Sequence, residues 1–264
     1  RYHFTPRSDF RMRVTLLGTG TSTGVPQVGC GCEVCRSTDP RDRRLRSAAL
    51  LDTDDGRRLL FDCGPDFRAQ MLSVDFRRLD AVFITHEHYD HVGGLDDLRP
   101  FCVYGDVDVY AQDDCADDLQ TRLPYCFAEH PYPGVPRISL RRIRPGEVVH
   151  VGEVEVRPFR VMHGRLPILG YRVGRFAYVT DMTRIASDSL HGLEGLDCLV
   201  VNALRFEPHP THQSLAEALA LVKQLSPRSA YFTHMSHGIG LHAETERLLP
   251  SNVHLGYDRL TIEV

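Results

Sequence analysis

The sequence lacks several features that would place the protein in a particular environment. None of its apolar runs approaches the roughly 18 residues that a membrane span needs. Its basic amino end, RYHFTPRSDFRMRV, has no apolar central stretch of the kind that marks a secretory signal. We therefore expect a protein that does not associate with membranes and that resides in the cytoplasm.

The sequence also lacks the excess of positive charge that general binding to nucleic acid requires. Its formal net charge is −4 at pH 7, whereas neutralising phosphates takes clustered Lys and Arg with a basic balance overall. Only RISLRRIR, residues 137–144, resembles a basic patch, and its alternating pattern is typical of a strand with one solvated face. Nucleic acid is therefore not an expected partner.

A disulfide framework is absent as well. Of the eight cysteines, Cys30, Cys32 and Cys35 lie within six residues of one another. The other five are scattered, mostly in apolar settings where a reduced thiol packs as a small hydrophobic group: Cys63, Cys102, Cys115, Cys126 and Cys198. This usage is typical of a protein in a reducing compartment.

What the sequence does contain is a long series of strand-like segments with helix-like segments between them. Residues 48–64 form a predicted hairpin with an Asp-Gly turn, and the strand-like residues 81–85 precede a predicted helix from Val92. The clearest helix, residues 214–225, repeats apolar residues at helical spacing. The pattern predicts one α/β (α+β) domain over residues 1–264, in which two mixed sheets pack face to face with helices outside.

Four side chains that commonly bind metals follow the strand at residues 81–85 within six positions. They are His86, His88, Asp90 and His91, in the stretch THEHYDH. Histidine and carboxylate groups ligate divalent metals of intermediate softness, and a turn that leaves a strand can direct several of them to one place. Because one ion cannot easily use all four, the spacing favours two adjacent ions with two of these ligands each.

THEHYDH has the His-x-His-x-Asp-His form of the metallo-β-lactamase superfamily, and the resemblance extends along nearly the whole chain. The resemblance implies an αββα sandwich whose remaining ligands follow later strands in the order His, Asp, His. His163, Asp181 and His234 fit this order, each directly after a strand-like run. It also implies that one ion is bound by His86, His88 and His163, the other by Asp90, His91 and His234, and that Asp181 bridges them.

Asp62, in LLFDCG, matches a frequent superfamily position whose carboxylate supports a ligand imidazole, although a simple turn carboxylate explains it equally well. The catalytic ions implied are zinc, manganese or iron, because His and Asp ligands accept all three.

The cysteine cluster GCGCEVC supplies three thiolates, one fewer than the four ligands of a closed structural zinc site. Its setting after a GTG loop and GVP, with a distant Thr-His-x-Ser-His, resembles the phosphoribosyl cyclic phosphodiesterases of the carbon-phosphorus lyase pathway. This resemblance implies one structural zinc ion held by Cys30, Cys32, Cys35 and His237.

Two neighbouring divalent ions can lower the pKa of a water molecule and hold a phosphoryl oxygen, but the leaving oxygen also needs a proton. His212 matches the general acid of the same family, and His209 is the competing choice. We count Asp90 and His212 as the catalytic residues. Arg205 and the loop GTGTSTG are weaker candidates for phosphate contacts.

These observations predict a binuclear metal-dependent phosphodiesterase that acts on a small phosphodiester, which we expect to be cyclic. The alternatives are an endonuclease of the type that processes the 3′ end of transfer RNA, or another hydrolase of the same fold. A non-enzymatic metal-binding protein would require the loss of a ligand, and none is missing. Residues 113–144 match the family least and are expected to shape the substrate pocket, and a homodimer is left open.

Overall fold

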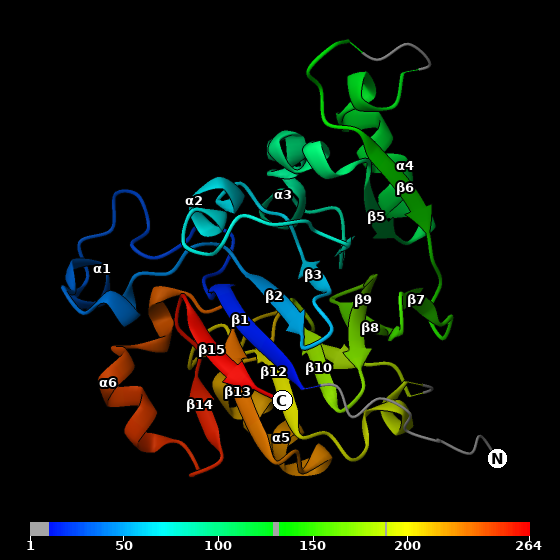
Figure 1. Cartoon of the computed structure of the whole chain (residues 1–264). Helices are drawn as coiled ribbons and strands as arrows, with labels where there is room; N and C mark the ends of the chain where they lie inside the picture. Colours follow the sequence, from blue (N-terminus) through cyan, green and yellow to red (C-terminus); the bar gives the residue numbers. More distant parts are fainter. Residues whose placement is uncertain (1–10, 129–131, 188) are drawn as a thin grey trace.

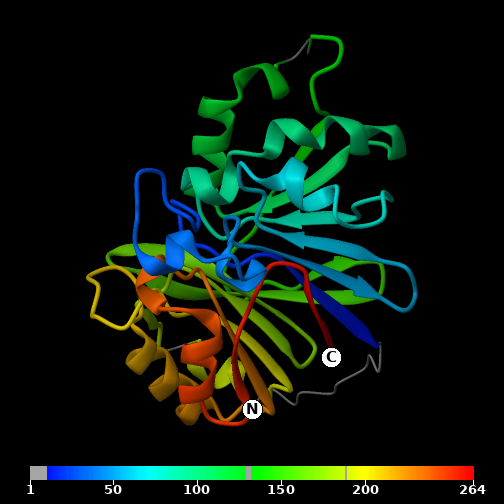
Figure 2. The ribbon, with the colours of Figure 1, turned by 90° about the vertical axis from the view of Figure 1, so that its left-hand side faces the viewer.

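The computed structural model describes residues 11–128, 132–187 and 189–264, so the amino-terminal stretch judged for a signal lies mostly outside it. The chain forms two mixed β-sheets that pack face to face, with helices on the outer face of each (Figures 1 and 2). The predicted αββα architecture is thereby confirmed. Within the described residues, no helix combines the length and the apolar character that crossing a membrane requires.

The first sheet has the strand order β15-β1-β2-β3-β4-β5-β6. The hairpin predicted at residues 48–64 is present as β2 and β3, and β3 to β6 then run parallel to one another. The strands are β1 (Met12–Gly18), β2 (Ala48–Thr53), β3 (Arg58–Phe61), β4 (Ala81–Phe83), β5 (Val107–Ala111), β6 (Ile138–Arg142) and β15 (Leu260–Glu263).

The second sheet has the order β11-β8-β9-β10-β12-β13-β14, with β7 paired to β8. Antiparallel hairpins form one half, and β10, β12, β13 and β14 run parallel in the other. Its strands are β7 (Val149–Val151), β8 (Val154–His163), β9 (Leu166–Val173), β10 (Phe176–Val179), β11 (Arg184–Ile185), β12 (Cys198–Asn202), β13 (Ser229–Thr233) and β14 (Val253–Leu255).

Among the described residues, the α-helices are short except for α4 and α5. They are α1 (Glu33–Arg36), α2 (Phe67–Met71), α3 (Tyr89–Val92), α4 (Asp113–Arg122), α5 (Leu215–Leu225) and α6 (His242–Thr245). Helix α5 begins with a capping box, in which Ser214 and Glu217 satisfy each other's backbone N–H groups. 3₁₀ turns lie at Pro40–Asp42, Leu95–Tyr104, Pro124–Cys126, Leu190–Leu193, His237–Ile239 and Glu246–Leu248.

The helix predicted to begin at Val92 differs from the structure. Helix α3 ends at Val92, and the chain continues as the 3₁₀ segment Leu95–Tyr104 after two glycines. A Cβ atom on Gly94 would lie 2.1 Å from the backbone oxygen of Gly64, so this close approach requires glycine. Pro100 also lies within the 3₁₀ segment, where it has no N–H to continue an α-helix.

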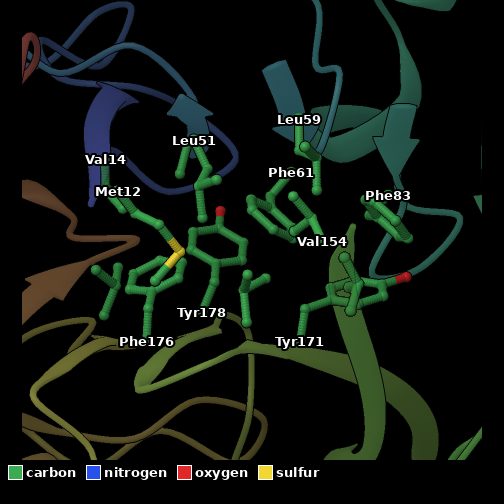
Figure 3. Packing of buried hydrophobic residues seen from close by; sticks show 14 of the residues in the cluster. Met12, Val14, Leu51, Leu59, Phe61, Phe83, Val154, Tyr171, Phe176 and Tyr178 are labelled. Carbon is green, nitrogen blue, oxygen red and sulfur yellow. The ribbon is translucent and has the colours of Figure 1, made fainter. Parts of the chain in front are cut away.

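Aromatic side chains from both sheets fill the space between them (Figure 3). Phe61 of β3 lies with its ring centroid 5.6 Å from those of Tyr171 and Tyr178 and 5.7 Å from that of Phe83. Separate apolar clusters lie under α2 to α4 and under α5, on the outer faces. The five scattered cysteines are all buried, as expected for thiols that pack as apolar groups.

The carboxyl ends of parallel strands from both sheets meet at one edge of the sandwich. Asp62 follows β3, Asp181 follows β10 and His234 follows β13, with φ angles of 64°, 57° and 55°. Residues other than glycine rarely adopt positive φ, and such strain is commonly found where a site is built. The left-handed turns direct all three side chains out of their strands at the same edge.

Candidate metal centre

Two groups of four side chains at this edge each lie close enough to hold one ion. The possible ligand atoms of each group all lie within 4.8 Å of one another. One group is His86, His88, His163 and Asp181, and the other is Asp90, His91, Asp181 and His234. The structure thus brings together every catalytic metal ligand expected from the sequence, and Asp181 belongs to both groups.

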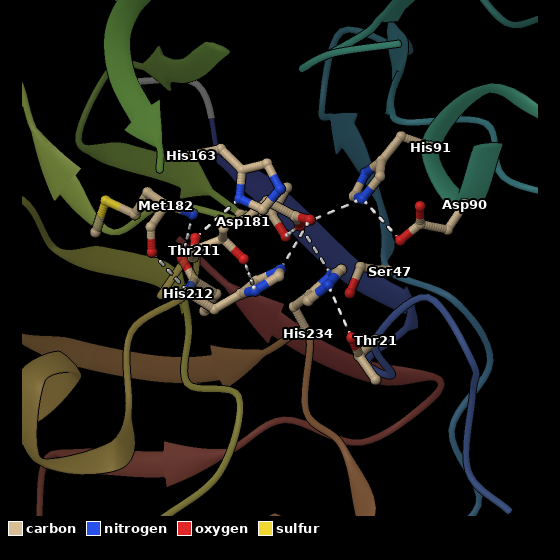
Figure 4. Close-up of polar contacts among 12 residues, drawn as sticks. Thr21, Ser47, Asp90, His91, His163, Asp181, Met182, Thr211, His212 and His234 are labelled. Carbon is tan, nitrogen blue, oxygen red and sulfur yellow. Dashed lines mark hydrogen bonds and ion pairs between the residues drawn. The ribbon is translucent and has the colours of Figure 1, made fainter. Parts of the chain in front are cut away.

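Asp181 lies at the middle of the centre, 2% exposed (Figure 4). Its Oδ1 is 2.9 Å from His234 Nδ1 and 3.2 Å from His91 Nε2, and its Oδ2 is 3.8 Å from His86 Nε2. Burial opposes the charge of this carboxylate, yet His234 and His91 hold the pKa of Asp181 well below its usual range. One carboxylate group therefore faces histidines of both groups.

The nitrogen atoms that face the middle of the centre lie near carboxylate oxygens, and His91 Nε2 is also 3.1 Å from Asp90 Oδ2, but they make no well-formed hydrogen bond. His86 Nε2, His91 Nε2 and His234 Nδ1 are buried without a hydrogen bond among the described residues. A buried polar nitrogen normally has a partner, because leaving it without one costs about 1–3 kcal/mol. Burial, followed by the neighbouring His91, also holds the pKa of His86 well below its usual range, which favours the neutral form that binds metals. The residues thus fit divalent metal ions.

Buried polar groups behind the histidines fix their orientation. Asp62, fully buried, accepts a hydrogen bond of 2.8 Å from His91 Nδ1 and further bonds from the backbone N–H and hydroxyl of Thr85. The Thr85 hydroxyl also lies 3.0 Å from His86 Nδ1. Such partners leave the opposite ring nitrogen free to bind a metal.

Sequence reasoning missed two more groups of this kind. The Thr21 hydroxyl lies 3.0 Å from His234 Nε2, and the backbone oxygen of Thr211 accepts a bond of 2.9 Å from His163 Nδ1 (Figure 4). Thr21 belongs to the loop GTGTSTG, whose position suggested phosphate contacts. Its hydroxyl is instead directed to His234, a contact that no local pattern in the sequence indicates.

Of the two candidate acids, His212 lies beside the metal ligands. Its Nε2 is 3.3 Å from Asp181 Oδ2, and its Nδ1 is 3.2 Å from His209 Nδ1 and 3.0 Å from the Thr211 hydroxyl. His209 therefore lies behind His212. Arg205 donates to backbone oxygen atoms of its own loop, so it makes contacts other than the phosphate contact considered from the sequence.

The cysteine cluster is a third and separate group. The sulfur atoms of Cys30, Cys32 and Cys35 lie 3.2, 3.6 and 3.4 Å from His237 Nδ1, and the four ligand atoms lie within 4.8 Å of one another. The backbone N–H of Cys35 donates to the Cys32 sulfur and lowers the pKa of that thiol. Three sulfurs and one imidazole nitrogen match the ligand set of a structural zinc site.

Comparison with protein families and solved structures agrees with this architecture. Residues 57–235 match the model of the beta-lactamase superfamily domain. A solved diphosphatase from the PhnP family is 39% identical, with a TM-score of 0.89 over 96% of this chain and 97% of that one.

Two curated relatives are similar to this chain over part of their length. An octanoyltransferase from Porphyromonas gingivalis is 47% identical over 250 residues, covering 94% of this chain and 51% of that protein. A ribonuclease Z from Thermosynechococcus vestitus is 33% identical over 168 residues, covering 61% of this chain and 36% of that protein. The chain thus spans about half or less of either protein.

Proposed function

The chain belongs to the metallo-β-lactamase superfamily and, within it, to the PhnP family, and on this premise we propose that it is a binuclear metal-dependent phosphodiesterase. It is a hydrolase of that fold, and the finer assignment concerns the metals and the bond that is cleaved. The observation that carries the proposal is the sharing of one buried carboxylate, Asp181, by two complete ligand groups.

The residues would divide between the ions as the two groups divide. His86, His88 and His163 would hold one ion, and Asp90, His91 and His234 the other, with Asp181 contributing to both. Two divalent ions, when bound, supply a water of lowered pKa and an electrophilic contact for a phosphoryl oxygen. The protein's own contribution is to fix the ligand nitrogens through Asp62, Thr85 and Thr21.

His212 would supply the remaining proton. Its ring lies against the centre with Nε2 at 3.3 Å from Asp181 Oδ2, and its side chain is 13% exposed, so a substrate could reach it. A protonated imidazole there can donate to the oxygen that leaves phosphorus, a contribution of about 10²–10⁴ in rate. His209, bonded to the far nitrogen of His212, orients it.

The cysteine cluster would bind one zinc ion that supports structure. All four positions of a tetrahedral ion would be filled by Cys30, Cys32, Cys35 and His237, which leaves none for a water or a substrate. Its place is the segment between β1 and β2, beside the turn after β13.

The proposed substrate is a small molecule in which phosphorus carries two bridging oxygens. A small, cyclic phosphodiester has this feature, and so does a diphosphate esterified at both ends, which the similarity to a PhnP-family diphosphatase favours as the second candidate. Helix α4 borders the site, because Gln112 donates to the Pro167 backbone oxygen and Arg122 to that of Glu87. Residues 113–144 would thus select the substrate.

A panel of substrates tests the proposal. Metal-free protein would be supplied with zinc, manganese or iron and assayed on a ribose cyclic phosphate, a dinucleoside diphosphate, bis-p-nitrophenyl phosphate, precursor transfer RNA and a β-lactam. We expect metal-dependent hydrolysis of at least one of the first three and none of the last two. Turnover of the transfer RNA or the β-lactam alone would overturn the phosphodiesterase assignment.

A further inference from the structure

The loop of residues 205–213, between β12 and α5, carries His212. It makes hydrogen bonds both to the centre around Asp181 and to the turn of the cysteine cluster. On one side, its Thr211 backbone oxygen accepts from His163 Nδ1, and Gln213 N–H donates to the Met182 backbone oxygen beside Asp181. On the other side, Phe206 N–H donates to the backbone oxygen of Gly238, the residue after His237. The position of this loop therefore decides where the His212 ring lies.

Arg205 closes the loop upon itself. Its Nε donates to the Glu207 backbone oxygen at 3.3 Å, and its Nη2 to that of Pro208 at 3.0 Å. Its own backbone oxygen accepts from Leu215 N–H at 2.8 Å, where α5 begins. A guanidinium is a rigid fork of donors, so one side chain can hold two successive carbonyl groups in a fixed relation.

The stem of Arg205 packs against the turn that follows the cysteine-cluster histidine. A Cβ atom on Gly238 would lie 3.0 Å from Arg205 Cβ and 3.5 Å from its Cδ. This turn is anchored to the start of the loop by the Ser236 hydroxyl, which donates to the Leu204 backbone oxygen. Glycine at position 238 thus permits a close contact between the turn of His237 and the loop of His212.

We propose that Arg205 is a positioning residue, which couples the turn after His237 to the 205–213 loop and so sets the orientation of His212 toward the leaving oxygen. The inference rests on the proposed function, because Arg205 acts only through His212. The cysteine cluster would then also affect catalysis, because Gly238, which follows His237, supports the loop that carries His212. Within the part of the chain that the structure describes, the side chain of Arg205 donates to Glu207 and Pro208 of its own loop and to no metal ligand.

A double-mutant cycle with two leaving groups tests this role. Arg205→Ala, His212→Ala and the double variant would be assayed, metal-replete, on phosphodiesters that release p-nitrophenol or the less acidic phenol. Because small misplacements of a catalytic group are costly, Arg205→Ala should lower kcat for the phenyl ester by about ten- to a hundredfold with little change in KM. The p-nitrophenyl ester should lose less than about twofold, because its leaving group departs without a proton.

The cycle separates a positioning role from a merely structural one. In the His212→Ala background, Arg205→Ala should have no further effect on the phenyl ester. Additive losses, or equal losses on both esters, would overturn the inference while leaving the proposed function intact. If His212→Ala itself shows no dependence on the leaving group, the acid role fails and the inference with it.

Two further variants keep the test decisive if Arg205→Ala folds poorly. Gly238→Ala pushes on the stem of Arg205 and should reproduce the leaving-group dependence in a milder form. Arg205→Lys keeps the positive charge but loses the planar guanidinium, so it should recover only part of kcat for the phenyl ester. Arg247→Ala removes an exposed arginine elsewhere and serves as the control. A Gly238→Ala enzyme with equal losses on both esters would contradict the coupling.

Discussion

The two kinds of metal-type site in this molecule are built in opposite ways. The centre around Asp181 is mostly buried, with His86, His91 and His234 each no more than 1% exposed and His88 exposed, and it gathers residues from the strand ends of both sheets. The cysteine cluster takes three of its four ligands from six consecutive residues of one surface segment, and Cys32 is exposed. The first depends on the whole fold, and the second depends on one segment and one turn.

The difference shows what each site needs from the protein. Buried histidines require hydrogen-bonding partners behind them, which Asp62, Thr85 and Thr21 provide. The cysteine sulfurs instead accept from backbone N–H groups of their own segment, Cys32 from Cys35 and Cys35 from Gln27. A shared carboxylate suits a site where reacting groups must be held in place, whereas a closed set of ligands suits a site that joins two segments.

Removing the shared carboxylate should produce the largest effect. Asp181→Ala takes a ligand from both groups at once, so we expect turnover of a phosphodiester to fall about a thousandfold or more. Steady-state rates at saturating metal measure this, with His191→Ala, an exposed histidine, as the control. A rate within tenfold of the unchanged protein would rule out the shared role.

Removing the acid should have the next largest effect, and it should depend on the substrate. His212→Ala should slow hydrolysis of an ester with a poor leaving group by about 10²–10⁴ and leave metal content unchanged. Single-turnover rates are the right measure, because they report the chemical step. Equal losses for good and poor leaving groups would assign His212 to phosphate binding instead.

The sequence, with the family resemblance, was sufficient for the ligands and for Asp62, which lies behind His91 as the resemblance implies, but not for the other groups behind the ligands. His86, His88, Asp90 and His91 are adjacent and directly follow a strand, and the resemblance placed the three later ligands at strand ends, where the structure has them. Thr21, in contrast, reaches a histidine 213 residues away. Thr21 follows a strand of the first sheet and His234 a strand of the second, so the contact depends on how the two sheets pack, which leaves no local pattern in the sequence.

Helix boundaries show the same limit at shorter range. The expected helix from Val92 failed because a close approach between Gly94 and the Gly64 backbone replaces a regular helix with 3₁₀ turns. The neighbour that decides this lies 30 residues earlier in the chain, so helical periodicity alone does not reveal it.

A change behind the buried centre should have a moderate effect. Asp62→Asn keeps the shape and tolerates the left-handed backbone at φ 64°, but it removes the charge that holds His91 Nδ1–H. We expect metal affinity to fall about 10- to 100-fold, as is usual for such partners. Metal titration followed by calorimetry checks this, and unchanged affinity would show that Asp62 serves only the backbone turn.

The smallest effect on chemistry should come from the cysteine cluster. Cys32→Ser should remove about one zinc equivalent and lower Tm by about 5 °C, which corresponds to about 2 kcal/mol in a chain of this size. Because the proposed link between this site and the reaction runs through the 205–213 loop, turnover should fall less than with Asp181→Ala. Elemental analysis and thermal melting measure both quantities, and unchanged zinc content would refute the zinc assignment.

The central claim, that the buried centre works with two ions, is tested most directly by a metal titration. A chelator would first remove the metal from the buried centre. Mn²⁺ would then be added stepwise while the hydrolysis of bis-p-nitrophenyl phosphate is followed. The account predicts that full activity requires about two equivalents, because Asp181 is shared by two ligand groups. Full activity after one equivalent, or activity that needs no added metal, would contradict it.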